Sequence, residues 1–220
     1  MSNLIEIAAA EIGTMEAEGI EHNPRILQYA EEAGFSQVDD DETPWCSIFM
    51  NWVASKSGLV RSKSGAARSW LTVGQAIETP EPGDVVIFWR VRRDSWQGHV
   101  GIFMGFSRDG SRIYCLGGNQ GNQVSISAYS ANQLLGFRRL YFDGKAKLKS
   151  KTLKLGDSGD DVQALQDALK MANFNPGTSD GFYGPKTETA VKELQSTLFG
   201  LEVSGIFNSK TRKHLLSLLN

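Results

Sequence analysis

The sequence contains few of the side chains that bind metals or act as nucleophiles, with two cysteines and three histidines in 220 residues. Cys46 and Cys115 cannot form the disulfide framework of a small secreted protein, so both can remain free thiols. The formal net charge of −2 provides no positive field for nucleic acid. No run of about 18 apolar residues is present, so the sequence predicts no membrane-spanning helix. We therefore expect a globular chain with neither nucleic acid nor a membrane as its partner.

The N-terminus lacks the basic segment and the long apolar segment of a secretory signal peptide. We therefore expect synthesis in the cytoplasm without a signal peptide. We also expect a monomer that needs no cofactor.

The hydrophobic pattern predicts an α+β domain over residues 1–142. Helical spacing comes first and predicts helices over 3–12, 23–34, 44–56 and 65–77. Short apolar runs separated by turn residues then predict strands over 85–89, 98–104, 113–116, 124–126 and 135–140. Helices followed by antiparallel strands indicate an α+β fold.

A second, smaller domain is predicted over residues 153–220. Residues 143–152 are rich in lysine and have no hydrophobic pattern, so we interpret them as a linker. The segment beyond them carries three apolar helical stripes, which predict a three-helix domain. Residues 181–187 resemble residues 205–211, and each of these two segments precedes a predicted helix. The small domain therefore contains a duplicated loop–helix unit.

Cys46 is the better placed of the two cysteines for chemistry. Thr43 is a favourable N-cap residue, and Pro44 would then occupy the first helical position. The unpaired N–H groups and the positive end of the dipole at such a helix start favour a thiolate. Cys46 is thus the candidate nucleophile, whereas Cys115 lies within a predicted strand and is expected to be a packing residue.

A cysteine nucleophile needs a base and a polar group that orients the base. His99 is the candidate base, because it begins a predicted strand and has glycines beside it. A three-residue turn with Gly110 in the left-handed position would place Asn119 opposite His99. A two-residue turn would place Gln120 there instead. We prefer Asn119 as the orienting residue and take Gln120 as a candidate oxyanion or substrate donor.

Four motifs carry a resemblance to a known family: Trp45-Cys46, Pro82-Gly83-Asp84, Gly98-His99-Val100-Gly101 and Gly117-Gly118-Asn119-Gln120. Together they resemble the CHAP and NlpC/P60-type cysteine peptidoglycan hydrolases, especially the phage branch, over residues 1–141. The resemblance implies a papain-like fold, with helices packed on an antiparallel sheet. It also implies that Cys46, His99 and Asn119 are the catalytic residues. Trp45 and Trp96 are further candidates for contact with substrate.

Residues 153–219 resemble the three-helix peptidoglycan-binding domain of the PG_binding_1 type, through the segments 155–166, 180–187 and 190–195. This resemblance makes Asp180, Phe182, Tyr183 and Thr187 candidates for contact with the wall.

One domain resembles hydrolases of bacterial peptidoglycan and the other resembles a domain that binds peptidoglycan. Together the two resemblances imply hydrolysis of an amide bond in this polymer by a Cys–His–Asn site. The phage branch implies an endolysin, synthesised in the host cytoplasm and acting on the wall. A wall toxin delivered by a secretion system and a wall-binding protein without catalysis are the alternatives. The acidic residues 39–42 are interpreted as a solvated loop, with calcium binding as the alternative that the family implies.

Overall fold

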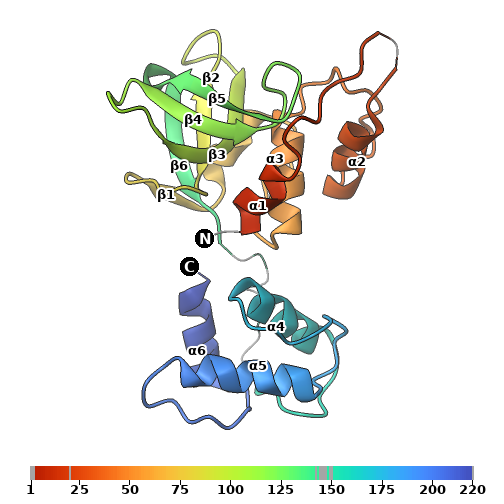
Figure 1. Cartoon of the computed structure of the whole chain (residues 1–220), viewed down its shortest axis with the longest axis vertical. Coiled ribbons are helices and arrows are strands. Elements are labelled where there is room, and N and C mark those ends of the chain that lie inside the picture. The colour runs from red at the N-terminus through yellow and green to blue at the C-terminus, as the bar shows by residue number, and fades with distance from the viewer. Residues whose placement is uncertain (1–2, 20, 142, 144–147, 149–150, 220) are drawn as a thin grey trace. The chain divides into compact units, whose positions relative to one another are not determined.

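The computed structural model describes residues 3–19, 21–141, 143, 148 and 151–219. The chain divides into two compact units, Met1–Leu140 and Tyr141–Asn220, which we call the N-terminal and C-terminal units (Figure 1). Most of the predicted linker lies outside the described residues. Within the described part of the chain, no helix has both the length and the apolar character to cross a bilayer.

The N-terminal unit has the predicted α+β fold, in which helices pack on an antiparallel sheet. Its helical elements are α1 (Asn3–Ala9), α2 (Pro24–Ala33), α3 (Cys46–Lys56) and the 3-10 helices η1 (Ala67–Thr72) and η2 (Ala131–Gln133). Its strands are β1 (Gln75–Ile77), β2 (Val85–Trp89), β3 (Gly98–Phe106), β4 (Arg112–Gly117), β5 (Ser125–Ser130) and β6 (Leu134–Arg139). The strands pair in the order β1-β6-β2-β3-β4-β5, and every pair is antiparallel.

The prediction of one helix over residues 65–77 is wrong, because this segment forms η1 and then β1. The helix ends because Val73 is extended, and Gly74 follows with φ +69°, a left-handed conformation that favours glycine. A Cβ at Gly74 would lie 2.4 Å from the carbonyl oxygen of Arg139. The close backbone approach that glycine permits brings β1 alongside β6, where Gln75 pairs with Arg139.

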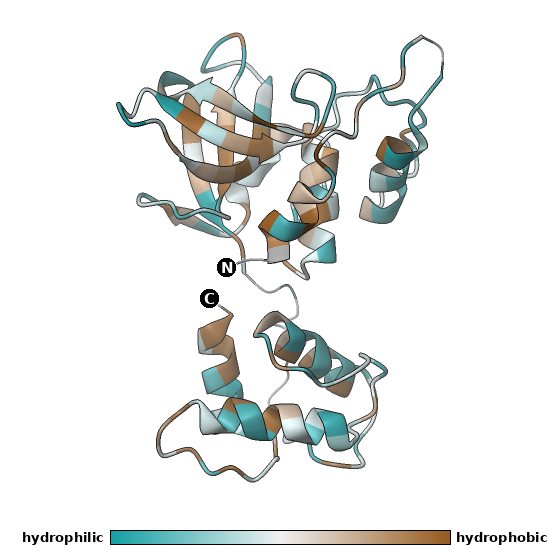
Figure 2. Cartoon of the chain, in the orientation of Figure 1, coloured by the Kyte–Doolittle hydropathy of each residue, from teal (hydrophilic) through white to brown (hydrophobic). Residues whose placement is uncertain are grey.

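The core of the N-terminal unit covers both faces of the sheet. Helix α3 is mostly apolar (Figure 2) and is buried from Cys46 to Ala54, and it packs with α1, α2 and η1 on the face that includes Val100 and Ile102. A smaller cluster around Phe88 and Phe103 occupies the other face. Because successive strand residues point to opposite faces, His99 lies on the side of the smaller cluster.

Asp84 of the Pro82-Gly83-Asp84 motif has a structural role. Its two carboxylate oxygens accept hydrogen bonds of 2.8 Å from Nε and Nη2 of Arg139, on β6. The backbone N–H of Glu81 also donates to this carboxylate. Asp84 is buried, and a bidentate arginine pair is a suitable partner for a buried carboxylate. The motif therefore fixes the start of β2 against β6.

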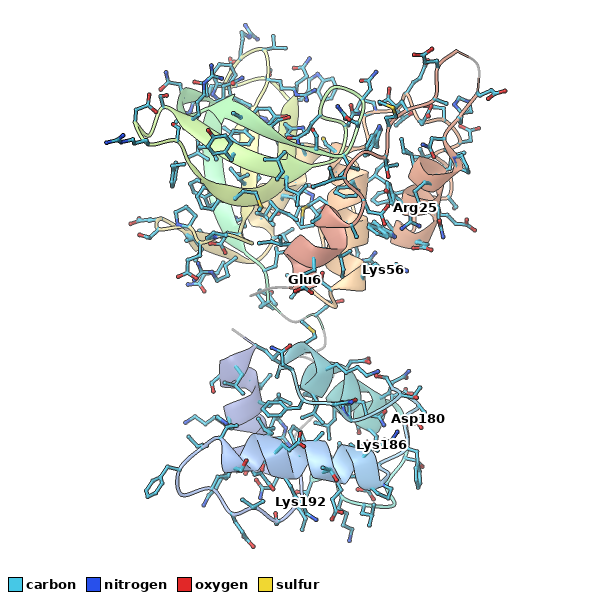
Figure 3. All side chains as sticks on the ribbon, viewed as in Figure 1. Glu6, Arg25, Lys56, Asp180, Lys186 and Lys192 are labelled. Carbon is cyan, nitrogen blue, oxygen red and sulfur yellow. The ribbon has the colours of Figure 1, made fainter. Side chains whose placement is uncertain are left out.

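Charged pairs join the helices of this unit at its surface. Lys56 of α3 and Arg25 of α2 are labelled in Figure 3; Lys56 lies 2.9 Å from the carboxylate of Glu32 of α2, and Arg25 forms an ion pair with Glu11. The guanidinium of Arg25 also lies 5.0 Å above the ring of Trp52. These contacts hold α2 against α3, the helix that begins at Cys46.

The C-terminal unit contains the three predicted helices, α4 (Asp160–Met171), α5 (Pro185–Ser196) and α6 (Ser209–Leu218). In the loop before α5, the N–H of Gly181 donates to Oε1 of Gln166, and Nε2 of Gln166 donates to Thr187 and to the carbonyl of Phe182. The glutamine amide therefore satisfies the polar groups of a tight loop from inside the core.

The loop before α6 repeats this arrangement. The N–H of Gly205 donates to Oε1 of Gln195, whose Nε2 donates to Thr211 and to the carbonyl of Ile206. Gly181 and Gly205 have φ values of +75° and +73°, so both loops need a residue without a Cβ. The repeated sequence segments thus share a backbone geometry and a buried glutamine partner.

Candidate functional site

Helix α3 begins at Cys46, so its thiol lies in the first turn as the sequence predicts. The predicted cap is wrong, because Trp45 is the N-cap residue and no side chain caps the helix. The backbone N–H and hydroxyl of Thr43 both donate to the carboxylate of Asp40. That turn uses the polar groups of Thr43, and Pro44 therefore stays outside the helix.

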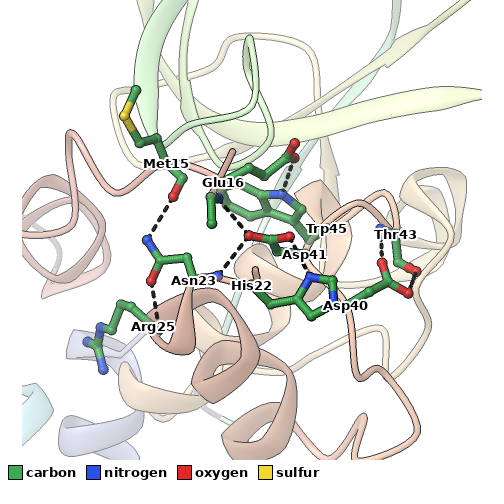
Figure 4. A network of polar contacts seen from close by, with 10 residues as sticks. Met15, Glu16, His22, Asn23, Arg25, Asp40, Asp41, Thr43 and Trp45 are labelled. Carbon is green, nitrogen blue, oxygen red and sulfur yellow. Dashed lines mark hydrogen bonds and ion pairs between the residues drawn. The ribbon is translucent and has the colours of Figure 1, made fainter. Parts of the chain in front are cut away.

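The segment before Cys46 is held by the buried carboxylate of Asp41 (Figure 4). Asp41 accepts hydrogen bonds of 2.9 Å from the backbone N–H groups of Ala17 and Asn23, and Nδ1 of His22 lies 3.0 Å from it. Burial raises the pKa of Asp41, but these hydrogen bonds outweigh burial and lower it overall. The same contact raises the pKa of His22. The network fixes the chain on the approach to α3.

Trp45 is also part of this support. Its indole N–H donates to Glu16 over 2.8 Å, and its side chain is only 1% exposed (Figure 4). The sequence makes Trp45 a candidate for substrate contact, but its burial makes the ring a packing residue beside Cys46. Trp96, by contrast, is 79% exposed and stays a candidate for substrate contact.

The acidic residues before Cys46 do not fit a calcium site. The carboxylates of Asp40 and Asp41 already accept hydrogen bonds from protein donors. Among the described residues, no group of three or more His, Cys, Asp and Glu side chains gathers as metal ligands would. Calcium needs six to eight oxygen ligands. These two carboxylates instead shape the loop.

His99, the candidate base, is fully buried at the start of β3. Its Nε2 lies 3.1 Å from Oε1 of Gln120, its Nδ1 lies 3.3 Å from Nη2 of Arg90, and its ring stacks on Tyr129 at 4.9 Å. Burial lowers the pKa of His99 to about 3, with a further lowering from the Arg90 charge and an opposing effect of the Gln120 bond. The ring is therefore neutral near pH 7.

The hydrogen-bond partners also assign the tautomer of His99. Nε2 of Gln120 donates to the carbonyls of Cys115, Gly117 and Ser125, which turns Oε1 toward the histidine. An amide oxygen only accepts, and a guanidinium only donates. The imidazole proton is therefore on Nε2, and Nδ1 carries the lone pair.

Gln120 takes the position that the sequence assigned to Asn119. The β3–β4 turn is longer than predicted, because the N–H of Ser107 donates to the carbonyl of Arg112. A bulge between Phe103 and Gly105 then restores the predicted register, and Ile102 pairs with Leu116. The ladder nevertheless ends before the position opposite His99.

The end of the ladder explains why Gln120 reaches His99. Strand β4 ends at Gly117, and Asn119 turns the chain with φ +55°. Gly118 permits this turn, because a Cβ there would lie 2.3 Å from the ring of Trp45. The next side chain, that of Gln120, then returns beneath the sheet to His99. The preference for Asn119 is thus corrected by a local turn that strand alternation does not reveal.

The thiol of Cys46 is 6% exposed, and burial raises its pKa. The positive charge of Arg90 and the backbone N–H groups of Val100 and Ser47 oppose this effect without reversing it. The thiolate predicted from the helix start is therefore not the favoured form. Among the hydrogen bonds between described residues, none joins the thiol to His99, and Val100 is the β3 residue that the thiol faces.

Arg90 is a residue of the site that the sequence did not reveal. It follows β2 directly, and its backbone N–H donates to the carbonyl of Gln97, which closes the loop before β3. The pairing of Phe88 with His99 places both ends of this loop beside the histidine. The sequence signal for Arg90 is its position directly after the predicted strand that precedes the strand of His99.

The four predicted wall-binding residues have different positions. Tyr183 and Thr187 are buried, with the Tyr183 hydroxyl donating to the carbonyl of Gly205, so their side chains support the fold. Asp180 accepts a hydrogen bond from Gln166. Phe182 is 51% exposed and stays a candidate.

A surface cavity of about 400 Å³ in the C-terminal unit was not predicted. It lies between the loop after α5 and α6, and its lining includes Phe199, Lys210, Lys213 and His214. Phe199 is fully exposed. An exposed aromatic ring beside two lysines combines an apolar contact surface with positive charge.

Comparison with known proteins gives two domain matches. Residues 38–119 match the CHAP domain family, and residues 158–215 match the peptidoglycan binding domain family. The N-acetylmuramoyl-L-alanine amidase CwlL of Bacillus licheniformis is 39% identical over 82 residues, which are 34% of this chain and 21% of that protein. A spore cortex-lytic enzyme of Bacillus cereus is 37% identical over 67 residues, 30% of this chain and 26% of that enzyme.

The chain spans about a fifth to a quarter of the length of these relatives. A chloroplast protein of Arabidopsis thaliana named protein disulfide isomerase pTAC5 is 38% identical over 72 residues, 31% of this chain and 18% of that protein. The crystal structure of the SleB N-terminal domain is 35% identical with a TM-score of 0.31, covering 33% of this chain and 97% of that domain. Proteins with different names therefore share these short segments with this chain.

Proposed function

Because this chain carries a CHAP domain at residues 38–119 and a peptidoglycan binding domain at residues 158–215, we propose that it is a peptidoglycan hydrolase that cleaves an amide bond of the wall peptide. Its nucleophile is Cys46, its base is His99 and its orienting residue is Gln120. The observation that supports this assignment is the His99 tautomer, which leaves the Nδ1 lone pair free of the Gln120 bond. A histidine arranged in this way can accept a proton from a thiol.

The reaction starts from a neutral pair. The proton of Cys46 passes to Nδ1 of His99 as Sγ attacks the amide carbon. The C–N bond then breaks, and Nδ1 returns the proton to the leaving amine. Water, deprotonated at Nδ1, hydrolyses the thioester and releases the carboxylic acid and the Cys46 thiol. Starting from neutral groups means that the ion pair forms only during the reaction.

The start of α3 supplies the donors for the oxyanion. The first N–H groups of a helix have no partner within the helix, and they can stabilise the negative oxygen of the tetrahedral intermediate. Gln120 was also a candidate oxyanion donor, but its amide hydrogens already bond to three backbone carbonyls. We therefore assign Gln120 to the orientation of His99.

The C-terminal unit would hold the enzyme on its polymer. We assign this contact to the cavity beside Phe199, because wall peptides carry carboxylates that complement Lys210 and Lys213. The apolar ring can lie against a sugar or an alanine methyl group.

The test uses purified sacculi whose amino groups have been acetylated, so that each cleaved amide releases a new amino group. We expect release by the wild-type protein and none by Cys46→Ala. Cys115→Ala is the matched control, because Cys115 is also a buried thiol but lies in β4 within the packing cluster. Equal release by wild type and Cys46→Ala would refute the proposal. Wild-type protein that pellets with sacculi without release would indicate a binding protein.

The bacteriolytic setting of an endolysin stays a prediction from the sequence. Expression together with a holin, which admits cytoplasmic protein to the wall, should lyse the host within minutes. A Cys46→Ala protein should not lyse the same cells.

A further inference from the structure

Arg90 occupies the nitrogen of His99 that the proposed reaction needs. Its Nη2 lies 3.3 Å from Nδ1, whereas Nε2 is held by Gln120. Nδ1 is therefore the atom that must take the proton of Cys46. In this structure, that atom accepts from a guanidinium, and the thiol faces the backbone of Val100.

The charge of Arg90 has no carboxylate partner among the described residues. Arg92 in the same loop, by contrast, is paired with a carboxylate, because its Nε lies 3.5 Å from Asp94. The Arg90 side chain is exposed, although its tip contacts a buried ring. Its side-chain partners near His99 are neutral groups, the imidazole and the hydroxyl of Tyr129, whereas a guanidinium can bind a carboxylate through two parallel bonds.

The surroundings of His99 give the Arg90 charge a direct effect on the base. Tyr129 of β5 stacks on the ring and the amide of Gln120 bonds to it, while the thiols of Cys46 and Cys115 interact electrostatically with Tyr129. None of these groups carries a negative charge near pH 7, since burial raises the pKa of both thiols and of Tyr129. Arg90 thus opposes the imidazolium that proton transfer would create.

From this geometry we propose that Arg90 is a substrate-binding residue that recognises a free carboxylate of the wall peptide and, by turning to it, releases Nδ1 of His99 for Cys46. The proposal rests on the proposed function. Its ligand is a carboxylate near the scissile amide. Binding of that carboxylate removes the guanidinium from Nδ1 and balances its charge, so the base becomes available only when an acidic peptide is in place.

The test compares acetylated sacculi with acetylated sacculi whose carboxylates have been converted to primary amides. We expect wild-type protein to release amino groups at least tenfold faster from the acetylated sacculi that keep their carboxylates. Arg90→Gln should cleave both at similar rates. Arg92→Gln is the matched control, since its charge lies in the same loop but is paired with Asp94, and it should keep the wild-type ratio.

A second readout separates this role from a merely structural one. Without the Arg90 charge, the pKa of His99 should rise, and the acidic limb of the kcat/KM profile should move to higher pH in Arg90→Gln. The ring nitrogens of His99 observed by NMR should show the same direction. An Arg90→Gln protein with the wild-type preference and an unmoved acidic limb would overturn the proposal. If the wild-type protein releases no amino groups from acetylated sacculi that keep their carboxylates, the proposed function is refuted instead. The two failures are therefore distinguishable.

Discussion

Acid should destabilise the N-terminal unit through His99. The buried ring has a pKa of about 3, whereas an unfolded histidine has a pKa of about 6.5. Between these values the unfolded chain binds a proton that the folded chain excludes, so folded stability falls as the pH decreases through this window. With these two pKa values, linkage gives a loss of about 3 kcal/mol between pH 7 and pH 4.

Urea unfolding followed by tryptophan fluorescence measures this effect in the complete chain. All five tryptophans belong to the N-terminal unit, so their signal reports on that unit alone. Carboxylates also lose favourable contacts in acid, and the measurement is therefore the difference between wild type and His99→Gln. We expect the wild-type protein to lose about 3 kcal/mol more than the variant over this range.

His22 provides a control, because its pKa is shifted in the direction opposite to that of His99. Contact with Asp41 raises its pKa, so its contribution is present in acid and is lost as the pH rises through the raised pKa. His22→Gln lacks this stabilisation in acid, so the variant should lose at least as much stability between pH 7 and pH 4 as the wild type. Should His99→Gln fail to fold, NMR of the wild-type ring decides the matter, because a His99 titration midpoint near 6.5 would refute the reasoning.

Two further substitutions test the packing and the wall contact. Gly118→Ala would bring a Cβ to 2.3 Å from Trp45 and should destabilise the N-terminal unit by about 2 kcal/mol in urea, whereas at Gly136 the nearest atom lies 3.6 Å from the added carbon and Gly136→Ala should cost much less. Equal losses would contradict this. In a catalytically inactive protein, Phe199→Ala should weaken pelleting with sacculi about tenfold. Val203→Ala removes a half-exposed apolar side chain outside the cavity lining and should have no effect; an unchanged Phe199→Ala would exclude the cavity as the wall contact.

The elements with strong patterns could be predicted from the sequence. The continuous apolar run of β2 and the repeated apolar positions of the C-terminal helices identify buried elements by themselves. Strand β1 could not be predicted, because its three residues are mostly exposed and its pairing depends on the distant strand β6. The start of α3 was displaced because Thr43 bonds to Asp40, a competition between two local motifs that single-residue preferences do not rank.

The site was partly predictable for a similar reason. Cys46 and His99 were identified by residue type and position, but their orienting partner depends on a turn, a bulge and a left-handed asparagine that together decide which side chain returns to the sheet. The charge state was not predictable, because helix position favours a thiolate and burial opposes it. In the structure, burial has the larger effect on the pKa of Cys46.

Buried glutamines hold loops in both units. Gln166 and Gln195 each bond through both ends of the amide to a glycine loop and a threonine, so their motifs serve only the fold. Gln120 likewise donates to three backbone carbonyls, but its oxygen accepts from His99. In all three cases the amide closes a loop, but only in Gln120 does its oxygen bond to the candidate base, His99. Replacing Gln120 by Glu would keep that oxygen but remove the donors that hold it, so the hydrogen bond to His99 depends on the loop that the amide closes.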